Sequence, residues 1–271
     1  MQEKEKNHRL NSAINDWRQW PLPLRQRPKV FAELNGGDIN ATLVIGDKEK
    51  KWTLKLFGHS EKSDRKNKIE ARAQQAAHPL GIAAELLYRN EEQRYQISEF
   101  IAGKTLRETE ENSAPQNKRA AVLSALVSAI KKLQKVSLDI PQIIYVERVE
   151  NYWGEIPHRH RIPLEAQYHH ALEKAIKLDQ STTADEAVLC HHDLNPGNIL
   201  RKEKKEIHLA LIDWEFAVRG PATMDFAILS VELDYDIEKL SRLSGHSQSS
   251  LILAADIYRT LCQLYNAAQQ F

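Results

Sequence analysis

The feature that most constrains the fold of this chain is a short loop between two apolar segments, within residues 190–200. Its sequence, Cys-His-His-Asp-Leu-Asn-Pro-Gly-Asn-Ile-Leu, contains the spacing His-x-Asp-x-x-x-x-Asn from His191 through Asp193 to Asn198. The Pro-Gly step favours a tight turn, and apolar residues flank it on both sides. A loop held by strands can present a carboxylate and an amide in fixed positions, which is typical of a catalytic site.

A second carboxylate, Asp213, follows the apolar segment Leu211-Ile212. Magnesium prefers hard oxygen ligands, usually one or two carboxylates together with phosphates and water. We therefore expect Asn198 and Asp213 to bind Mg2+, and Asp193 to accept a proton from an attacking hydroxyl. This division of roles is that of kinase chemistry, with Asp213-Trp214-Glu215 in place of the Asp-Phe-Gly motif of protein kinases.

The first part of the chain is rich in strand signals. Short runs of apolar and β-branched residues alternate with Gly- and Asp-containing turns, and one helical segment interrupts them. The predicted strands are Lys29–Leu34, Ala41–Ile45, Trp52–Phe57, Ala84–Tyr88 and Tyr95–Phe100, and the predicted helix is Lys62–Ala77.

Three features of this part suit the phosphates of ATP. Lys55 lies on the strand face opposite Trp52, and Glu70 in the following helix can fix the position of its ammonium group. The Gly36-Gly37 turn between the first two strands can cover phosphates with backbone N–H groups. Each feature alone is weak, because such turns and lysines are common, so their order along the chain carries the interpretation.

The second part of the chain is mostly helical. We expect the boundary where Gly103 interrupts the pattern, which gives residues 1–102 as an N-terminal lobe and 103–271 as a C-terminal lobe. The predicted helices are Lys118–Val136, Leu164–Leu178, Ala222–Val231 and Ser247–Ala268, and the predicted strands are Ala187–Cys190 and Ile207–Ile212.

Composition limits the class of protein. A chain of 271 residues suits two joined lobes. The formal net charge of +1 gives no reason to expect a nucleic acid partner. Two distant cysteines, the absence of an apolar N-terminal leader and the lack of a membrane-spanning run predict a cytoplasmic protein without membrane insertion.

Two other chemistries fit the sequence less well. A zinc site around His191 and His192 is conceivable, but adjacent residues on an extended chain point to opposite sides. Cys190 and Cys262 lack the motifs that surround nucleophilic cysteines, so we expect them to be inert thiols.

Taken together, these motifs resemble those of the aminoglycoside phosphotransferase and choline kinase superfamily, closest to its choline, ethanolamine and thiamine kinase branch. The resemblance covers about residues 30–232 and implies an α+β, two-lobed, protein-kinase-like fold that uses ATP and Mg2+. It likens Gly36 through Asn40 to the phosphate loop, and Ser98 to Leu106 to the hinge, where Glu99 and Ile101 would contact adenine. It likens residues 191–198 to the catalytic loop, 213–215 to the metal-binding segment, and 220–227 to a supporting stretch whose aspartate is Asp225.

The departures from protein kinases favour a small acceptor. The chain lacks a full Gly-x-Gly-x-x-Gly loop, an Ala-Pro-Glu segment and an evident activation loop. In the choline branch, acidic and aromatic side chains hold a cationic amine. We expect Glu215, Glu232 and Trp214 to contact the substrate here, with Asp234, Tyr235 and Trp153 as further candidates.

The expected function is therefore an ATP- and Mg2+-dependent kinase that phosphorylates a hydroxyl group of a cationic metabolite. Thiamine is the first choice, and choline or ethanolamine the second. The alternatives are an antibiotic phosphotransferase of the aminoglycoside type and a nucleotide-binding regulator without catalysis. The sequence leaves open the acceptor, the oligomeric state and the role of residues 1–28.

Overall fold

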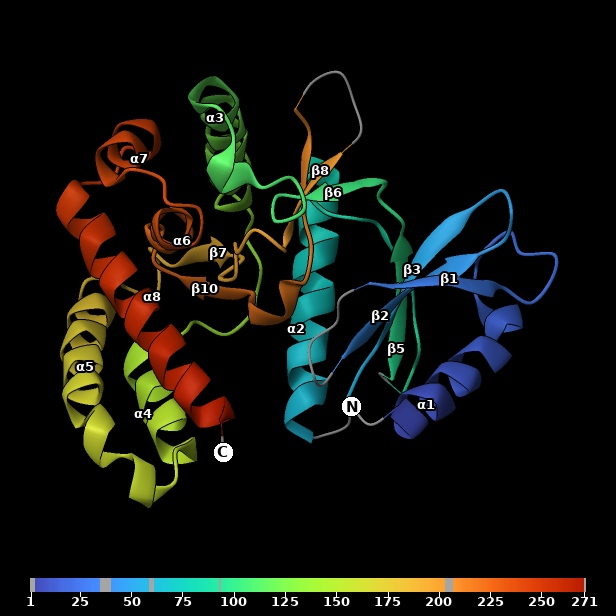
Figure 1. Cartoon of the computed structure of the whole chain (residues 1–271), viewed down its shortest axis with the longest axis horizontal. Coiled ribbons are helices and arrows are strands. Elements are labelled where there is room, and N and C mark those ends of the chain that lie inside the picture. The colour runs from blue at the N-terminus through green and yellow to red at the C-terminus, as the bar shows by residue number, and fades with distance from the viewer. Residues whose placement is uncertain (1–2, 35–39, 59–60, 93, 203–206, 271) are drawn as a thin grey trace. The chain divides into compact units, whose positions relative to one another are not determined.

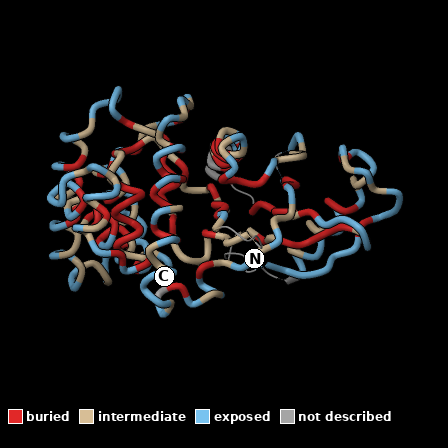
Figure 2. The backbone as a smooth tube through the Cα atoms, turned by 90° about the horizontal axis from the view of Figure 1, so that it is seen from above, coloured by how far each residue is buried: buried red, intermediate tan, exposed pale blue. Residues whose placement is uncertain are grey.

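The computed structural model describes residues 3–34, 40–58, 61–92, 94–202 and 207–270 and divides into two compact units, Met1–Gly103 and Lys104–Phe271. The first unit is built on an antiparallel sheet, and the second is mainly helical (Figure 1). In each unit, buried segments lie inside and exposed segments outside (Figure 2). These elements confirm the predicted α+β class. Among the described helices, none has the length and apolar character needed to span a membrane.

The sheet of the first unit has the strand order β1-β2-β3-β5-β4, and every neighbouring pair is antiparallel. Its β2–β3 hairpin turns at Gly46, where an added Cβ would meet the Lys50 carbonyl oxygen at 2.1 Å. The resulting register places Lys55 between Thr42 and Gln96. The strands are β1 (Lys29–Leu34), β2 (Ala41–Gly46), β3 (Lys51–Leu56), β4 (Leu86–Arg89) and β5 (Tyr95–Glu99).

The N-terminal segment completes the core of the first unit. Helix α1 (Glu3–Asn15) and the turn after it bring Ala13, Ile14 and Trp20 into the apolar cluster of the sheet. The Trp20 indole donates a hydrogen bond to the Tyr95 hydroxyl over 3.0 Å. Helix α2 (Glu61–Ala77) also contacts the strands through a buried polar group, as the 2.9 Å bond from Gln74 to the Ser98 hydroxyl shows.

The second unit packs its helices around an almost fully buried segment of α6, in which Met224 to Ser230 are all buried. Two small sheets accompany the helices. Strands β7 (Val188–Cys190) and β10 (Val218–Gly220) form one, while β6 (Gly103–Thr105), β8 (Ile199–Lys202) and β9 (Leu209–Leu211) form the other. The helices are α3 (Gln116–Leu133), α4 (Tyr145–Glu155), α5 (Glu165–Gln180), α6 (Met224–Glu232), α7 (Ile237–Ser244) and α8 (Gln248–Gln269).

Every helix and strand range predicted from the sequence overlaps an observed element of the same type. Helices α1, α4 and α7 and the short strands β6, β8 and β10 were not predicted from the sequence. Each missed strand has three or four residues, too few to establish an alternating pattern.

Candidate active site

The loop that contains Asp193 connects β7 to β8, and the Asp225 side chain of α6 holds it by hydrogen bonds. One carboxylate oxygen of Asp225 accepts from the His191 backbone N–H and the other from the His192 backbone N–H, both over 2.9 Å. Asp225 is fully buried. Burial raises its pKa to about 6, although the two N–H bonds act in the opposite direction. The anchor thus fixes the loop directly before Asp193.

The two histidines of the loop are buried and point into the protein. The His191 Nε2 donates to the Ile212 carbonyl over 3.1 Å, and its ring packs on Trp214 at 4.5 Å between centroids. The His192 Nε2 lies 3.0 Å from the Tyr145 hydroxyl. Burial lowers the pKa of His191 to about 4 and of His192 to about 3. Both rings are therefore neutral at pH 7 and support the loop.

Asp193 is held by two amides from its own loop. Its carboxylate accepts from the Asn195 amide over 3.0 Å and from the Asn198 amide over 2.6 Å. The Asn195 oxygen in turn accepts from the Gly197 backbone N–H over 2.8 Å, which closes the tight turn. These bonds orient the carboxylate while leaving it half-buried.

The surroundings of Asp193 raise the pKa of its carboxyl above the ordinary value. Burial raises the pKa of this carboxyl to about 6, and the negative charges of Asp213 and Glu232 raise it further against the two amide bonds. A carboxylate with a pKa closer to neutrality is a better general base than one with the ordinary value. Asp193 therefore has the geometry and the environment of a base.

Asp213 follows β9 in a left-handed backbone conformation, with φ of 62°. Such a conformation is uncommon outside glycine, though tolerated by aspartate, and occurs often at functional sites. The Ile212 backbone N–H donates to the Asn198 carbonyl over 2.9 Å, so the segments that carry the two predicted metal ligands are bonded to each other.

The donor set fits Mg2+. The Asn198 amide nitrogen donates to both the carbonyl and the carboxylate of Asp193, which leaves its side-chain oxygen as the coordinating atom. Together with the Asp213 carboxylate, it forms a pair of hard oxygen donors, the kind of protein contribution that Mg2+ takes beside phosphates. Among the described residues, no three His, Cys, Asp or Glu side chains are grouped as a metal site on their own.

A second carboxylate in this region has a defined partner. Glu232, the last residue of α6, accepts a hydrogen bond from the Tyr258 hydroxyl of α8 over 3.0 Å. Its charge acts on both Asp193 and Cys262, whose thiol pKa burial raises to about 11. Glu232 was predicted from the sequence, whereas Tyr258 was not, because only the packing of α6 against α8 brings it to this position.

Among the aromatic side chains predicted to contact the substrate, the burial of Trp214 contradicts that prediction. Trp214 is 1% exposed, and its indole donates to the Leu211 carbonyl, so the ring packs inside the unit and offers no surface to a substrate. Tyr235 is buried beside Arg119, and Trp153 stacks on Tyr168. Glu215 is half-buried next to Trp214 in the chain, and Asp234 is exposed.

The first unit brings together the predicted phosphate-binding pair. The Lys55 ammonium of β3 lies 2.7 Å from the Glu70 carboxylate of α2, and both side chains are buried. Asn40, just before β2, accepts from the Gly58 backbone N–H over 3.1 Å. Glu99 ends β5, and Ile101 follows it. Gly36 and Gly37 lie outside the described residues.

Comparison with known proteins identifies related folds. Residues 30–245 match the phosphotransferase enzyme family, APH, while no curated protein matches the chain. The solved structure of choline kinase LicA from Streptococcus pneumoniae is 16% identical, with a TM-score of 0.71 over 89% of this chain and 86% of that one. A LicA complex with AMP gives 17% identity and a TM-score of 0.71, covering 96% and 89%.

An antibiotic-modifying enzyme has the same fold. APH(2")-IIia in complex with GDP and kanamycin is 14% identical, with a TM-score of 0.70 over 94% of this chain and 90% of that chain. At such low identities the likeness establishes the fold. It confirms the predicted kinase-like architecture, and the family match confirms the resemblance found in the motifs.

Proposed function

The chain belongs to the phosphotransferase enzyme family, and we propose that it transfers the γ-phosphoryl group of ATP to a hydroxyl group of a small molecule. The observation that carries this proposal is the Asp193 carboxylate, half-buried and held by the Asn198 amide at 2.6 Å. An oriented carboxylate with a raised pKa suits the removal of a hydroxyl proton. A pure binding module has no need of such a group.

In the proposed reaction, the acceptor hydroxyl gives its proton to Asp193 while its oxygen attacks the γ-phosphorus of ATP. The bond from the γ-phosphorus to the bridging oxygen breaks, and ADP leaves with that oxygen. Asn198 and Asp213 would hold Mg2+, which when bound neutralises charge on the phosphate oxygens. The supporting contact from Asn198 keeps the Asp193 carboxylate in one orientation during the transfer.

The first unit is assigned to the nucleotide. Lys55 would contact the α- and β-phosphates, with Glu70 fixing its ammonium group through their 2.7 Å ion pair. Asn40 and the Gly36-Gly37 turn would contribute to phosphate binding. The backbone at Glu99 and Ile101 would contact adenine. The nucleotides AMP and GDP bound in structures of the same fold support a nucleotide role.

The acceptor is proposed to be cationic. Glu232 supplies a carboxylate held by Tyr258, and its charge acts on the same base that would receive the proton. Glu215 is a further candidate for charge pairing. Choline kinase and a kanamycin-bound phosphotransferase share this fold, and both small molecules carry cationic nitrogen. Thiamine remains our first choice of acceptor, followed by choline and ethanolamine, with aminoglycosides as the alternative.

The test is Mg2+-dependent ADP release with thiamine, choline, ethanolamine and kanamycin as acceptors and glycerol as a neutral control. We expect one cationic acceptor to stimulate release well above the glycerol rate. Stimulation by kanamycin alone would favour the antibiotic phosphotransferase. If ATP stabilises the protein thermally while no acceptor increases ADP release, the regulator is the better interpretation. If ATP does not bind with Mg2+ present, the proposal is wrong.

A further inference from the structure

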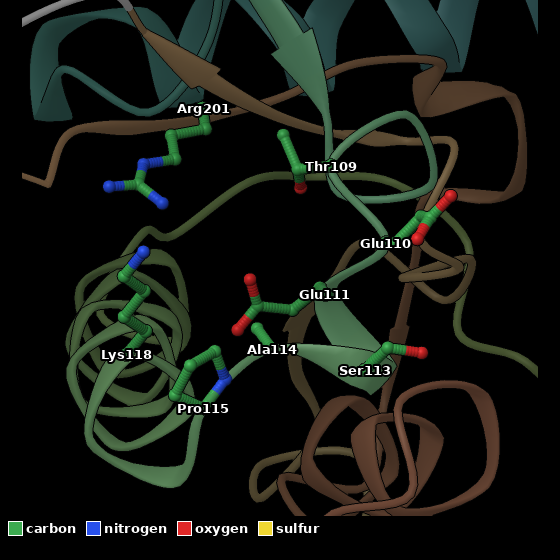
Figure 3. A pocket seen from close by; sticks show the side chains of 8 residues that line it. All are labelled: Thr109, Glu110, Glu111, Ser113, Ala114, Pro115, Lys118 and Arg201. Carbon is green, nitrogen blue, oxygen red and sulfur yellow. The ribbon is translucent and has the colours of Figure 1, made fainter.

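A polar cavity of about 350 Å³ lies in the second unit, where the segment after β6 meets the start of α3 and the strand β8. Figure 3 shows that the side chains of Glu111, Lys118 and Arg201 extend toward the same space. None of these residues has a role in the proposed phosphoryl transfer. The lining residues are Thr109, Glu110, Glu111, Ser113, Ala114, Pro115, Lys118 and Arg201.

The floor of the cavity holds a buried carboxylate. Glu111 is 3% exposed, and within the described part of the chain its Oε1 has no hydrogen-bond partner. Buried polar atoms are nearly always hydrogen-bonded, because an unpaired one loses its water without compensation. Burial raises the pKa of the Glu111 carboxyl, against the positive charges of Arg119 and Arg201 and a hydrogen bond from the Tyr235 side chain. A hydrogen-bond donor of a ligand in the cavity would therefore satisfy the Oε1 atom.

The opposite wall is positive. Lys118 is exposed in the first turn of α3, and Arg201 is half-buried on β8. Among the described ion pairs, none joins Glu111 to either of these residues. The three charged groups therefore line the cavity without pairing with one another. Helix α3 begins after Pro115 without a side-chain cap, and its dipole adds positive potential at this end.

The wall that carries Glu111 is fixed to its surroundings. The Glu111 backbone N–H donates to the Leu106 carbonyl over 3.1 Å, and the Leu106 N–H donates to the Ile199 carbonyl over 2.9 Å. Arg107 makes a third backbone bond, to Pro196 over 3.0 Å. A charged group held on rigid backbone keeps its position before a ligand arrives, which reduces the ordering cost of binding.

We propose that this cavity binds a small zwitterion. Its carboxylate or phosphate group lies between Lys118 and Arg201, and its ammonium group donates to the Glu111 carboxylate. The near-balance of charge in the lining favours a ligand that carries both signs over a simple anion or cation. The volume lies at the lower end of small-molecule sites, roughly 300–1,000 Å³, which suits an amino acid or the phosphate ester of an amino alcohol.

Isothermal titration calorimetry of the full chain without nucleotide tests this site. The zwitterions are serine and ethanolamine phosphate, which distinguish a carboxylate from a phosphate group. Inorganic phosphate and ethylamine each carry one half of the proposed ligand. We expect at least one zwitterion to bind more tightly than both half-ligands. Binding of neither zwitterion at about 10 mM, a concentration that would fill a site of millimolar affinity, would overturn the proposal.

Substitution of Glu111 gives effects of opposite sign. Glu111→Gln removes the partner of the ammonium group and should weaken the zwitterion by roughly tenfold or more. The same change removes a negative charge near the anion and should strengthen binding of inorganic phosphate. A folding defect would weaken both ligands, so the opposite signs identify the proposed contact. Equal affinities for zwitterion and phosphate that are insensitive to this substitution would show a simple anion site and contradict the proposal.

Two further variants locate the binding. Lys118→Met should weaken every probe that carries an anionic group, whereas Lys132→Met, at an exposed position near the other end of α3, should leave binding unchanged. Glu232→Gln changes the proposed acceptor region and should also leave zwitterion binding intact. Loss of binding in Glu232→Gln with retention in Lys118→Met would place the ligand at the acceptor region and overturn the inference. These measurements do not depend on phosphoryl transfer.

Discussion

The side-chain amide of Asn198 donates to the Asp193 carboxylate over 2.6 Å and to the Asp193 carbonyl over 3.1 Å. The proposed base and one proposed metal ligand are thus joined within a single loop. Because both amide hydrogens are used, the amide oxygen is directed away from Asp193. One residue can therefore orient the base and offer an oxygen to Mg2+.

The Lys55–Glu70 ion pair should matter for both stability and nucleotide binding. Lys55→Met leaves a buried carboxylate without its cation, and the free energy of unfolding should fall by roughly 3–5 kcal/mol. Lys55→Met/Glu70→Leu should recover part of that loss, because no uncompensated charge remains, but should not recover ATP turnover. Urea denaturation and ADP release measure the two effects.

Lys51→Met is the matched control for this pair, since Lys51 is exposed on the same strand. Its effect on stability should stay below roughly 1 kcal/mol. An unchanged KM for ATP in Lys55→Met would contradict the assignment of Lys55 to the phosphates.

Glu232 should determine affinity for a cationic acceptor. Glu232→Gln should raise the KM for the acceptor about tenfold or more, because a charge-assisted contact is lost, while the KM for ATP stays constant. Tyr258→Phe removes the hydroxyl that holds Glu232 and should act in the same direction with a smaller effect. Glu238→Gln, on the exposed side of α7, provides the control. Equal kinetics for Glu232→Gln and Glu238→Gln would exclude Glu232 from acceptor binding.

The buried histidines predict a pH-dependent stability. Burial lowers the pKa of His192 to about 3 from 6.5, so the folded state stays neutral where the unfolded chain takes up a proton. The contribution of neutral His192 to the free energy of unfolding is fully present above pH 6.5 and is lost as the pH falls toward 3. His192→Asn abolishes this titration. Its destabilisation relative to the parent should therefore shrink by roughly 1 kcal/mol for each pH unit below 6.5.

Tyr145→Phe separates titration from packing. It removes the hydroxyl that contacts His192 at 3.0 Å but leaves the imidazole in place. Its destabilisation should therefore vary little with pH. The buried carboxyls of Asp193 and Asp225, with raised pKa values of about 6, titrate in all three proteins and cancel in the comparison. Parallel pH profiles for His192→Asn and the parent would show that His192 does not titrate as described.

The N-terminal segment should contribute to the stability of the first unit. Trp20 is 4% exposed within the sheet core, and Trp20→Ala should lower the free energy of unfolding by roughly 3–5 kcal/mol. Trp17 is only partly buried, so Trp17→Ala should have a clearly smaller effect. Urea denaturation followed by circular dichroism measures both. Equal effects would indicate that the segment does not pack as an extension of the core.

The elements that carried long or repeated patterns could be predicted from the sequence. Strand β1 was predicted with its observed bounds, and helix α3 extends two residues earlier and ends three residues earlier than predicted. Helix α1 was not predicted, because its exposed face is charged and only a few apolar residues, such as Ala13 and Ile14, enter the core. The segment after α1 is held by the distant Tyr95, whose hydroxyl accepts a hydrogen bond from the Trp20 indole, and such a contact cannot be predicted from local sequence.

In the candidate site, too, the residues set by local sequence could be predicted, and those set by distant packing could not. Asp193, Asn198 and Asp213 could be predicted because their chemistry depends on local spacing within one loop and one strand end. Tyr258 and the Asp225 anchor depend on how α6 and α8 pack, and only Asp225 was found, through a family resemblance. Trp214 was predicted to contact the substrate because aromatic residues occur both in cores and at cation sites. Its burial shows that it packs in the core.

The most direct test of the central claim compares Asp193→Asn with Asp139→Asn in Mg2+-dependent phosphoryl transfer. Asp139 is exposed and distant in sequence from the loop, so it controls for the loss of one carboxylate. With the best acceptor, Asp193→Asn should reduce the rate of ADP release by roughly 100-fold or more while ATP still binds, and Asp139→Asn should match the parent. An Asp193→Asn protein that retains the parent's rate would contradict the assignment of this carboxylate as the base.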